Sequence, residues 1–459
     1  MCHFKFLFMK KIIYTYIAVF FFFTACSEDF TELAPENFLN AQEFYKTQDD
    51  FNSAVIAAYA KLQTHVSLYF ELEYRSDNLN ILAPTAGTQD RFDLNEFKET
   101  TANGIVQNAW RIYYNQIFRC NVITDNIGST NFDLKNQYEA EARFLRALTY
   151  FNVVRIWGDV PLVLSQVSPE DALSVPRSPA SEVYAAIEAD LVFAAANLPL
   201  SASSFGRVTS GAAKALLGKV YLNEKKYIEA ISILNEIVGQ FTLLPDVKDV
   251  FDTNNKLNKE IIFSIRFDKE LLGENHSLWL GVSDVSTADL SSKLIDAYQA
   301  GDTRKFLADY QSNGSLFAPG KFLDTESGAT RLFGNDYIVL RYADVLLMIA
   351  ESQNEIGYQS SGIAFDYLND VRERAGLTAL TAIDIQDQTS FRAFVLNERF
   401  LEFPYEGHRW FDLARTNTAK KELAELGKTV QDHQLVFPIP QAEIEKINNP
   451  DIFPQNPGY

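Results

Sequence analysis

Apolar and small side chains recur every three or four residues along much of the first 240 positions. This spacing places them on one face of an α-helix. The pattern predicts helices over 53–62, over 110–127 and over the stretch YEAEARFLRALTYFNVVRIW, which begins at Tyr138. The third helix is expected to end at Gly158, with Pro161 beyond it, because glycine tolerates the backbone turn that closes a helix.

One stretch, GRVTSGAAKALLGKVYLNEKKYIEAISILNEIV, has the spacing of a helix–turn–helix repeat. Leu217-Gly218 precedes Tyr221, and Ala230 lies four residues before Leu234, as in tetratricopeptide repeats. Small residues at such positions let paired helices approach closely. Weaker copies of the pattern occur in VYAAIEADLVFAAANLP and in the stretch that begins RYADVLLMIAESQNEIG. We therefore expect a mainly α fold of about four irregular helical hairpins, stacked into a right-handed superhelix.

Residues 241–335 lose the helical period. Asn, Asp, Gly and Ser are frequent there, and short apolar pieces such as EIIFSIRF alternate as β-strands do. Because binding residues concentrate on loops held by a rigid scaffold, this loop-rich insert is expected to carry ligand contacts. No Pro/Ser-rich linker interrupts the chain, so we expect a single body over 26–459, with an N-terminal part at 26–240 and a C-terminal part at 336–459.

The N-terminus carries a different signal. Two lysines precede an apolar run from Ile12 to Ala25, which is shorter than the roughly 20 residues that cross a membrane. Such a pattern is typical of a secretory signal peptide, here residues 1–25, and a start at Met9 stays open. The letters FTAC, ending at Cys26, resemble a bacterial lipobox, which implies cleavage before Cys26 and acylation of its thiol. An ordinary secretory signal with an incidental cysteine is the alternative.

The charge is strongly negative, with 60 Asp and Glu against 41 Lys and Arg, a net charge of −19. Loss of residues 1–25 removes three lysines and no acid, which brings the net charge from −19 to −22. Such a chain repels nucleic acid and anionic membrane surfaces, because phosphate binding needs clustered basic residues. Neutral or cationic ligands are favoured. Cys120 is the one thiol left once Cys26 is acylated, so no intramolecular disulfide is expected.

Several long motifs resemble one known family. They are EARFLRALTYFNVVRIWGDVPLV, RYADVLLMIAESQNEIG, LNDVRERAGL, ERFLEFPYEGHRWFDLAR and the terminal VFPIPQAEI with NPDIFPQNPGY. In this order they resemble the SusD/RagB family of outer-membrane nutrient-binding lipoproteins of the Bacteroidetes. The resemblance runs from the lipobox to Tyr459. It implies tetratricopeptide-like hairpins with a loop-rich ligand-binding half, and a SusC-like TonB-dependent transporter as partner, over which the lipoprotein acts as a hinged lid.

The motif ERFLEFPYEGHRWFDLAR places paired carboxylates beside His408, a combination that also occurs in active sites. A structural interpretation explains it better. Glu398 and Glu402 lie one helical turn apart, where they can pair with Arg399 and Arg409. We therefore predict a salt-bridge network that holds the C-terminal segment to the helical body.

Signals of catalysis and of metal binding are weak. The sequence has no G-x-S-x-G elbow or Gly-rich phosphate loop, and Cys120 has no neighbouring histidine. The mature chain's histidines lack zinc-ligand spacing. DTNNKLNKE, from Asp252, carries oxygens that suit calcium but lacks the glycine and spacing of an EF-hand. The sequence therefore predicts a binding protein with no catalytic residue, metal or cofactor.

Sugars are recognised by aromatic rings against their C–H faces and by carboxylate, amide and guanidinium groups that hydrogen-bond their hydroxyls. The stretch EYRSDNLNILAPTAGTQDRF offers both kinds of group in chain that we expect to be non-helical. Two aromatic residues of the insert add further platforms. The candidate ligand-binding residues are Arg75, Asp77, Asn78, Arg91, Phe92, Trp279 and Tyr310. For each the alternative is packing, and Asp77 and Asn78 can also serve as caps that close the loop.

We expect a lipid-anchored outer-membrane protein, exposed at the cell surface, that binds a nutrient oligosaccharide and delivers it to a SusC-like transporter. An oligopeptide ligand is the first alternative, because only four tryptophans are present and three lie in helical motifs. The acidic charge would also suit cationic peptides. A tetratricopeptide-type scaffold that binds only proteins is the second alternative, and it predicts no cleft for a small ligand.

Overall fold

The computed structural model describes residues 44–81, 87–202, 204, 206–271, 288–313, 316–324 and 334–459. The chain divides into two units, Met1–Asp50 and Phe51–Tyr459. Every element and site discussed below belongs to the second unit, apart from the first residues of one helix. Among the helices of these ranges, none combines the length and the apolar composition that crossing a membrane requires.

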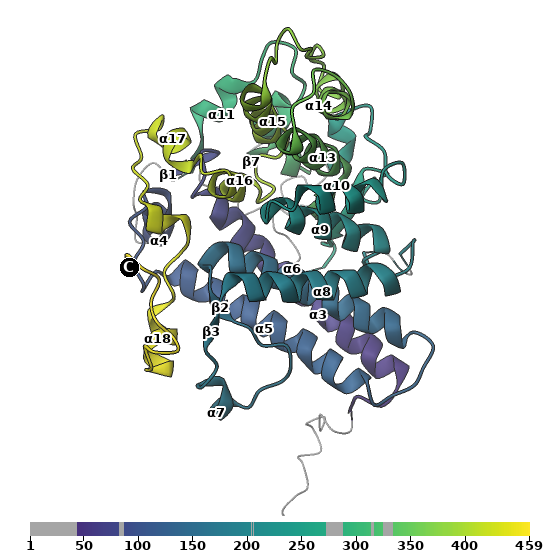
Figure 1. The fold of residues 1–459 in the computed structure, drawn as a ribbon, viewed down its shortest axis with the longest axis vertical. Coiled ribbons are helices and arrows are strands. Elements are labelled where there is room, and N and C mark those ends of the chain that lie inside the picture. Colours follow the sequence, from purple (N-terminus) through teal and green to yellow (C-terminus); the bar gives the residue numbers. More distant parts are fainter. Residues whose placement is uncertain are drawn as a thin grey trace, which may run out of the picture. The chain divides into compact units, whose positions relative to one another are not determined.

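Helices dominate the described ranges, as the sequence predicted (Figure 1). The α-helices are α3 (Gln48–Glu73), α4 (Gln89–Asn95), α5 (Gly104–Ile127), α6 (Lys135–Trp157), α7 (Pro169–Ala172), α8 (Ala180–Asn197), α9 (Ser210–Asn223), α10 (Tyr227–Asn235), α11 (Ser292–Ala297), α12 (Lys305–Ala308), α13 (Tyr342–Ile356), α14 (Ile363–Arg374), α15 (Gln388–Glu402), α16 (Arg409–Arg415), α17 (Ala419–Ala424) and α18 (Gln441–Ile447). Short 3-10 helices are η2 (Val247–Phe251), η4 (Gly320–Phe322) and η6 (Asp432–Leu435).

The three helices predicted from the first periodic stretches are confirmed as parts of α3, α5 and α6. α6 ends before Gly158, whose φ of +73° lies in the left-handed region that favours glycine. Nearly every side of α6 is buried, because α5 packs against it on one side and α8 on another. A helix that is apolar on most of its circumference is typical of such a central position.

The predicted repeat is the helical hairpin of α9 and α10. Ala230 and Leu234 of α10 are fully buried. A Cβ added to Gly218 of α9 would collide with the side chain of Leu234, so only glycine allows the two helices to pack this closely. In Figure 1, α8, α9, α10, α13 and α14 follow one another from the middle of the view to its top, and each packs against the next.

The strands form separate antiparallel pairs. The piece EIIFSIRF contains β4 (Ile261–Ile265), as predicted, and β4 pairs with β8 (Tyr337–Arg341). The other pairs are β1 (Leu79–Ile81) with β5 (Ala288–Leu290), β2 (Val160–Pro161) with β3 (Arg177–Ser178), and β6 (Tyr310–Asn313) with β7 (Leu316–Pro319). An isolated two-stranded pair is marginally stable, so these depend on the helices around them.

The predicted C-terminal salt-bridge network is present, and it is buried. Arg341 lies at its centre with 1% of its side chain exposed. Its guanidinium pairs with Glu402 (2.6 Å), Glu406 (2.8 Å) and Glu260 (3.1 Å). Through these carboxylates the start of α13, the end of α15 and the chain before β4 are held together.

The predicted partners within that network were wrong. Glu398 pairs with Arg304 (2.5 Å) and Arg372 (3.0 Å), which belong to other elements. Arg399 instead pairs with Asp344 of α13 and Asp412 of α16. The reason is geometric: consecutive helical residues point about 100° apart, so Arg399 faces a different neighbour from the glutamate before it.

Candidate functional site

The pairing of β1 with β5 joins two distant stretches that the sequence singled out. Leu79 lies opposite Leu290, and Ile81 lies opposite Ala288. The loop after α3 therefore runs beside the middle of the loop-rich insert, where β5 lies. Trp279 precedes β5 but lies outside the described residues, as Cys26 does. Tyr310 begins β6, where its backbone lies opposite Pro319.

Arg75 has a structural role. Its side chain is fully buried, and its guanidinium donates to Glu99 (2.5 Å) and to the backbone carbonyl of Gln434. The guanidinium also lies over the rings of Phe437, at 4.3 Å, and Trp410, at 4.9 Å. Arg75 therefore ties the C-terminal segment to the chain after α3, and no part of it reaches solvent.

Asp77 and Asn78 are also fully buried. Asp77 accepts two hydrogen bonds from Arg409 (2.7 and 2.8 Å) and pairs with Lys293 (3.1 Å). Burial raises the pKa of Asp77, but these two cations outweigh it and hold the pKa below its usual value. Asn78 donates to Glu73 (2.5 Å). Both residues therefore brace the loop from within, which agrees with the packing alternative rather than with direct ligand contact.

Arg91 and Phe92 keep half-buried side chains. The expectation of non-helical chain is wrong here, because both residues belong to α4. This helix is too short to show a helical period in the sequence, and Gln89 and Asp93, one turn apart, are joined by a 2.8 Å hydrogen bond. The guanidinium of Arg91 lies 4.0 Å from Glu71.

Two ionisable groups beside β1 and α4 were missed in the sequence. Burial raises the pKa of Glu71 to about 7, although the charge of Arg91 opposes this shift. Lys428 donates to Asn80 of β1 (3.3 Å), and burial lowers its pKa to about 8. Glu71 lies on α3 beyond the predicted helix at 53–62, and Lys428 lies 348 residues from Asn80, so no local motif pointed to either.

The predicted residues with accessible side chains, Arg91 and Phe92, lie near Glu71, Asn80 and Lys428. We call these five residues the β1–α4 surface. They supply a carboxylate, an amide, a guanidinium, an aromatic ring and an ammonium group around one short strand and one short helix. These are the groups that recognise the hydroxyls and C–H faces of a sugar.

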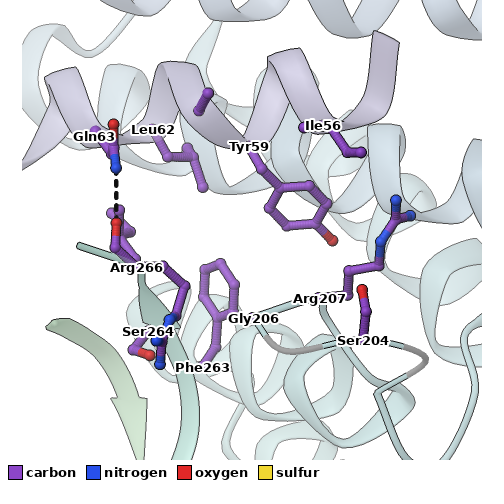
Figure 2. A pocket seen from close by; sticks show the side chains of 12 residues that line it. Ile56, Tyr59, Leu62, Gln63, Ser204, Gly206, Arg207, Phe263, Ser264 and Arg266 are labelled. Atoms are coloured by element: carbon purple, nitrogen blue, oxygen red, sulfur yellow. Dashed lines mark hydrogen bonds between the residues drawn. The ribbon is translucent and has the colours of Figure 1, made fainter. Parts of the chain in front are cut away.

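A hollow of about 340 Å³ lies between α3, the segment around Gly206 and β4 (Figure 2). Tyr59 and Phe263 point toward each other across it. At one end Gln63 donates to the backbone carbonyl of Arg266 (2.9 Å). The sequence did not predict this hollow, because its walls come from three segments far apart in the chain.

The polar groups of this hollow are largely engaged by the protein itself. The hydroxyl of Tyr59 accepts a hydrogen bond from the backbone N–H of Val208 (3.1 Å). Arg207, at the other end, pairs with Glu141 (2.9 Å). A polar ligand would find apolar walls but few unengaged partners, so the hollow of Figure 2 suits a sugar less well than the β1–α4 surface does.

Within the part of the chain that the structure describes, no three His, Cys, Asp or Glu side chains are grouped as metal ligands. Cys120 is fully buried, and burial raises the pKa of its thiol to about 12. A thiol that stays protonated is a poor nucleophile.

Comparison with known proteins gives concordant matches. A family model described as SusD family matches residues 297–459, and one described as starch-binding associating with outer membrane matches residues 29–222. Among curated proteins, SusD-like protein P2 of Formosa agariphila is 29% identical, with 98% of this chain and 100% of that protein covered.

Solved structures give the same fold. A laminarin-binding SusD-like protein is 26% identical, with a TM-score of 0.77 over 90% of this chain and 100% of that one. A SusD-like protein from Bacteroides fragilis has a TM-score of 0.79 at 23% identity, over 93% of this chain and 99% of that one.

Proposed function

Because this chain belongs to the SusD-like family, we propose that it binds a nutrient oligosaccharide and delivers it to a SusC-like TonB-dependent transporter. The observation that carries the carbohydrate ligand is the likeness to a laminarin-binding SusD-like protein along 90% of the chain. The protein does no chemistry in this proposal, so affinity and closure over the transporter perform the function.

The β1–α4 surface is the proposed binding face. Arg91 and Phe92 contact the ligand, together with Trp279 and Tyr310 from the insert that contains β5. Arg75, Asp77 and Asn78 stay beneath this face and hold its shape, because their buried ion pairs and hydrogen bonds connect it to the C-terminal segment.

The test is isothermal titration of the protein from Ser27 onward with laminarin, laminarihexaose and a panel of neutral plant, algal and host glycans. Arg91→Ala and Phe92→Ala are each expected to weaken glycan binding about tenfold, which corresponds to roughly 1.4 kcal/mol. The matched control is Arg392→Ala, which removes another partly exposed arginine paired with a glutamate, on α15. Absence of any glycan binding, or binding that both variants leave intact, would refute the proposal.

An oligopeptide ligand is the second candidate, and the net charge of −19 favours it because cationic peptides would be attracted. The same titration with a matched panel of cationic and neutral peptides separates the two. Binding to peptides alone would show that the ligand is a peptide and not a glycan, while the proposed transporter partnership would stand. Binding to neither would favour a scaffold that recognises only proteins.

Cys26 is the proposed lipid anchor, and an outer-membrane transporter is the proposed partner. Tagged protein from the native cell is expected in the outer-membrane fraction, with a SusC-like barrel purifying alongside it. Cys26→Ala should move it to the soluble fraction, because the acyl chains that hold it are absent. Cys120→Ala is the control, since that thiol is buried. Membrane retention of Cys26→Ala would contradict the anchor, and a preparation without a barrel would contradict the partnership.

A further inference from the structure

A second hollow, of about 350 Å³, shares no lining residue with the β1–α4 surface. Its walls are α5, the segment 161–175 that contains α7, and α18 with the C-terminal segment after it. We call it the α5 hollow. Its volume lies at the lower end of the range for small-molecule sites, which suits one or two sugar rings.

One wall of the α5 hollow is an aromatic stripe. Trp110, Tyr114 and Phe118 follow one another at intervals of four residues, so they lie along one face of α5 over about 12 Å. Phe118 has 51% of its surface exposed, so its ring is open to a ligand at the mouth of the hollow. Tyr114 donates to the carbonyl of Pro161 (2.9 Å), and this bond holds its ring in place.

The stripe also carries a polar group without a partner. Trp110 is 5% exposed, and its indole N–H makes no hydrogen bond within the described structure. Asn115, on the rim, is exposed; its side-chain oxygen accepts from Arg119 (3.0 Å), which leaves its NH₂ group to donate. The α5 hollow therefore combines flat apolar rings with unengaged hydrogen-bond donors.

We propose that the α5 hollow is a second carbohydrate subsite, which takes one or two neutral sugar residues of the same glycan. This inference rests on the proposed function. Sugar C–H faces would cover the stripe, and a hydroxyl would accept from Trp110. A purely apolar occupant would bury that N–H without a partner, at a cost of about 1–3 kcal/mol. Glu443 and Lys446 pair with each other (2.9 Å) and add no net charge. The one further cation among the described residues of the lining, Arg111, donates to Asn108 (2.7 Å).

Two subsites on one chain change how polymers bind. Once one part of a polysaccharide is held, the second contact becomes intramolecular, so a chain that reaches both subsites binds more tightly than a short one. Short oligosaccharides would instead occupy each subsite independently. The two subsites are therefore separable by comparing polymer with oligomer.

The experiment is titration of the protein from Ser27 onward with laminarin, laminarihexaose and the tightest-binding glycan of the panel. Phe118→Ala is expected to lower the affinity for the polymer about tenfold or more and to reduce the oligomer stoichiometry from two to one. Arg91→Ala should weaken binding at the other subsite about tenfold. Val192→Ala, which shortens another exposed apolar side chain, is the matched control.

Each outcome decides a different question. If Arg91→Ala weakens binding and Phe118→Ala does not, the second subsite is refuted while the proposed function stands. If no glycan binds the unmodified protein, both are refuted. If Phe118→Ala leaves glycan binding intact but releases a polypeptide that otherwise purifies with the protein, the α5 hollow is a docking face, which also overturns the proposal.

Discussion

Arg341→Met is expected to destabilise the protein by about 3–5 kcal/mol, because it removes the central cation of a buried cluster of carboxylates. Arg341 pairs with Glu402, Glu406 and Glu260 at 2.6–3.1 Å. Methionine fills a similar volume but leaves those carboxylates under-compensated. Arg374 still pairs with Glu402 after the change, so the network weakens without vanishing.

Urea unfolding of the chain from Ser27 onward measures the effect. Lys446→Met is the matched control, since its ion pair with Glu443 is half exposed and such pairs contribute about 0–1 kcal/mol. Arg341→Lys should recover part of the loss, because it restores the charge but not the bidentate geometry. Equal midpoints for Arg341→Met and Lys446→Met would show that the buried network does not stabilise the fold.

The second large effect is expected in acid: stability should change little between about pH 6.5 and 4.5 and then fall steeply. Two buried histidines make the folded protein less stable as the pH falls. Burial lowers the pKa of both His65 and His408 from 6.5 to about 3. The unfolded chain therefore takes up these protons first, so their stabilising contribution is present above pH 6.5 and is lost as the pH falls toward 3.

Two buried glutamates have the opposite effect and make the folded protein more stable as the pH falls. Burial raises the pKa of Glu71 and of Glu73 from 4.5 to about 7. In their case the folded chain takes up the proton first, so stability is gained as the pH falls from 7 to 4.5. Burial also raises the pKa of the more exposed Glu224 to about 7, and together these gains oppose the losses from the histidines, which produces a region of little change.

Below about pH 4 the losses of stability dominate. Burial raises the pKa of Asp344, Glu402 and Asp412, but the arginines and lysines paired with them outweigh burial and hold each pKa well below its usual value. The unfolded chain therefore binds these protons first, and stability falls with each of them as the pH drops. Urea unfolding from pH 8 to pH 3 measures the profile.

His65→Leu isolates one histidine from that profile. Both ring nitrogens of His65 lack a hydrogen-bond partner, so leucine removes a titrating group without breaking a bond. The stability of the variant should rise as the pH falls from 6.5 to 4.5, and it should fall less steeply than that of the unmodified protein below pH 4.5. Gln116→Leu is the control, because it replaces another buried side chain with an unpartnered atom but does not titrate. Parallel profiles for His65→Leu and the unmodified protein would contradict the explanation.

Much of the fold could be predicted because its causes are local. Helical spacing identified α3, α5 and α6, and glycine and proline marked where α6 ends. The small residue at Gly218 predicted the close approach of α9 and α10, which its contact with Leu234 confirms. Long motifs identified the family, whose models match 29–222 and 297–459.

The candidate site was only partly predictable. The sequence pointed to the stretch after α3, but it could not tell buried residues from half-exposed ones within it. Asp77 is buried because Arg409, 332 residues later in the chain, folds onto it. Arg75 is buried because Gln434, 359 residues later, packs against it. No spacing rule reaches across such separations.

The amino-acid sequence by itself determined where helices form, because backbone hydrogen bonds and side-chain spacing act within a few residues. It also determined the family and the acidic charge. Only the tertiary structure decided which arginine meets which carboxylate, that Glu71 lies near Arg91 and Lys428 near Asn80, and that α5 and α18 enclose a hollow. Those contacts depend on how distant segments pack, and packing is a property of the whole folded chain.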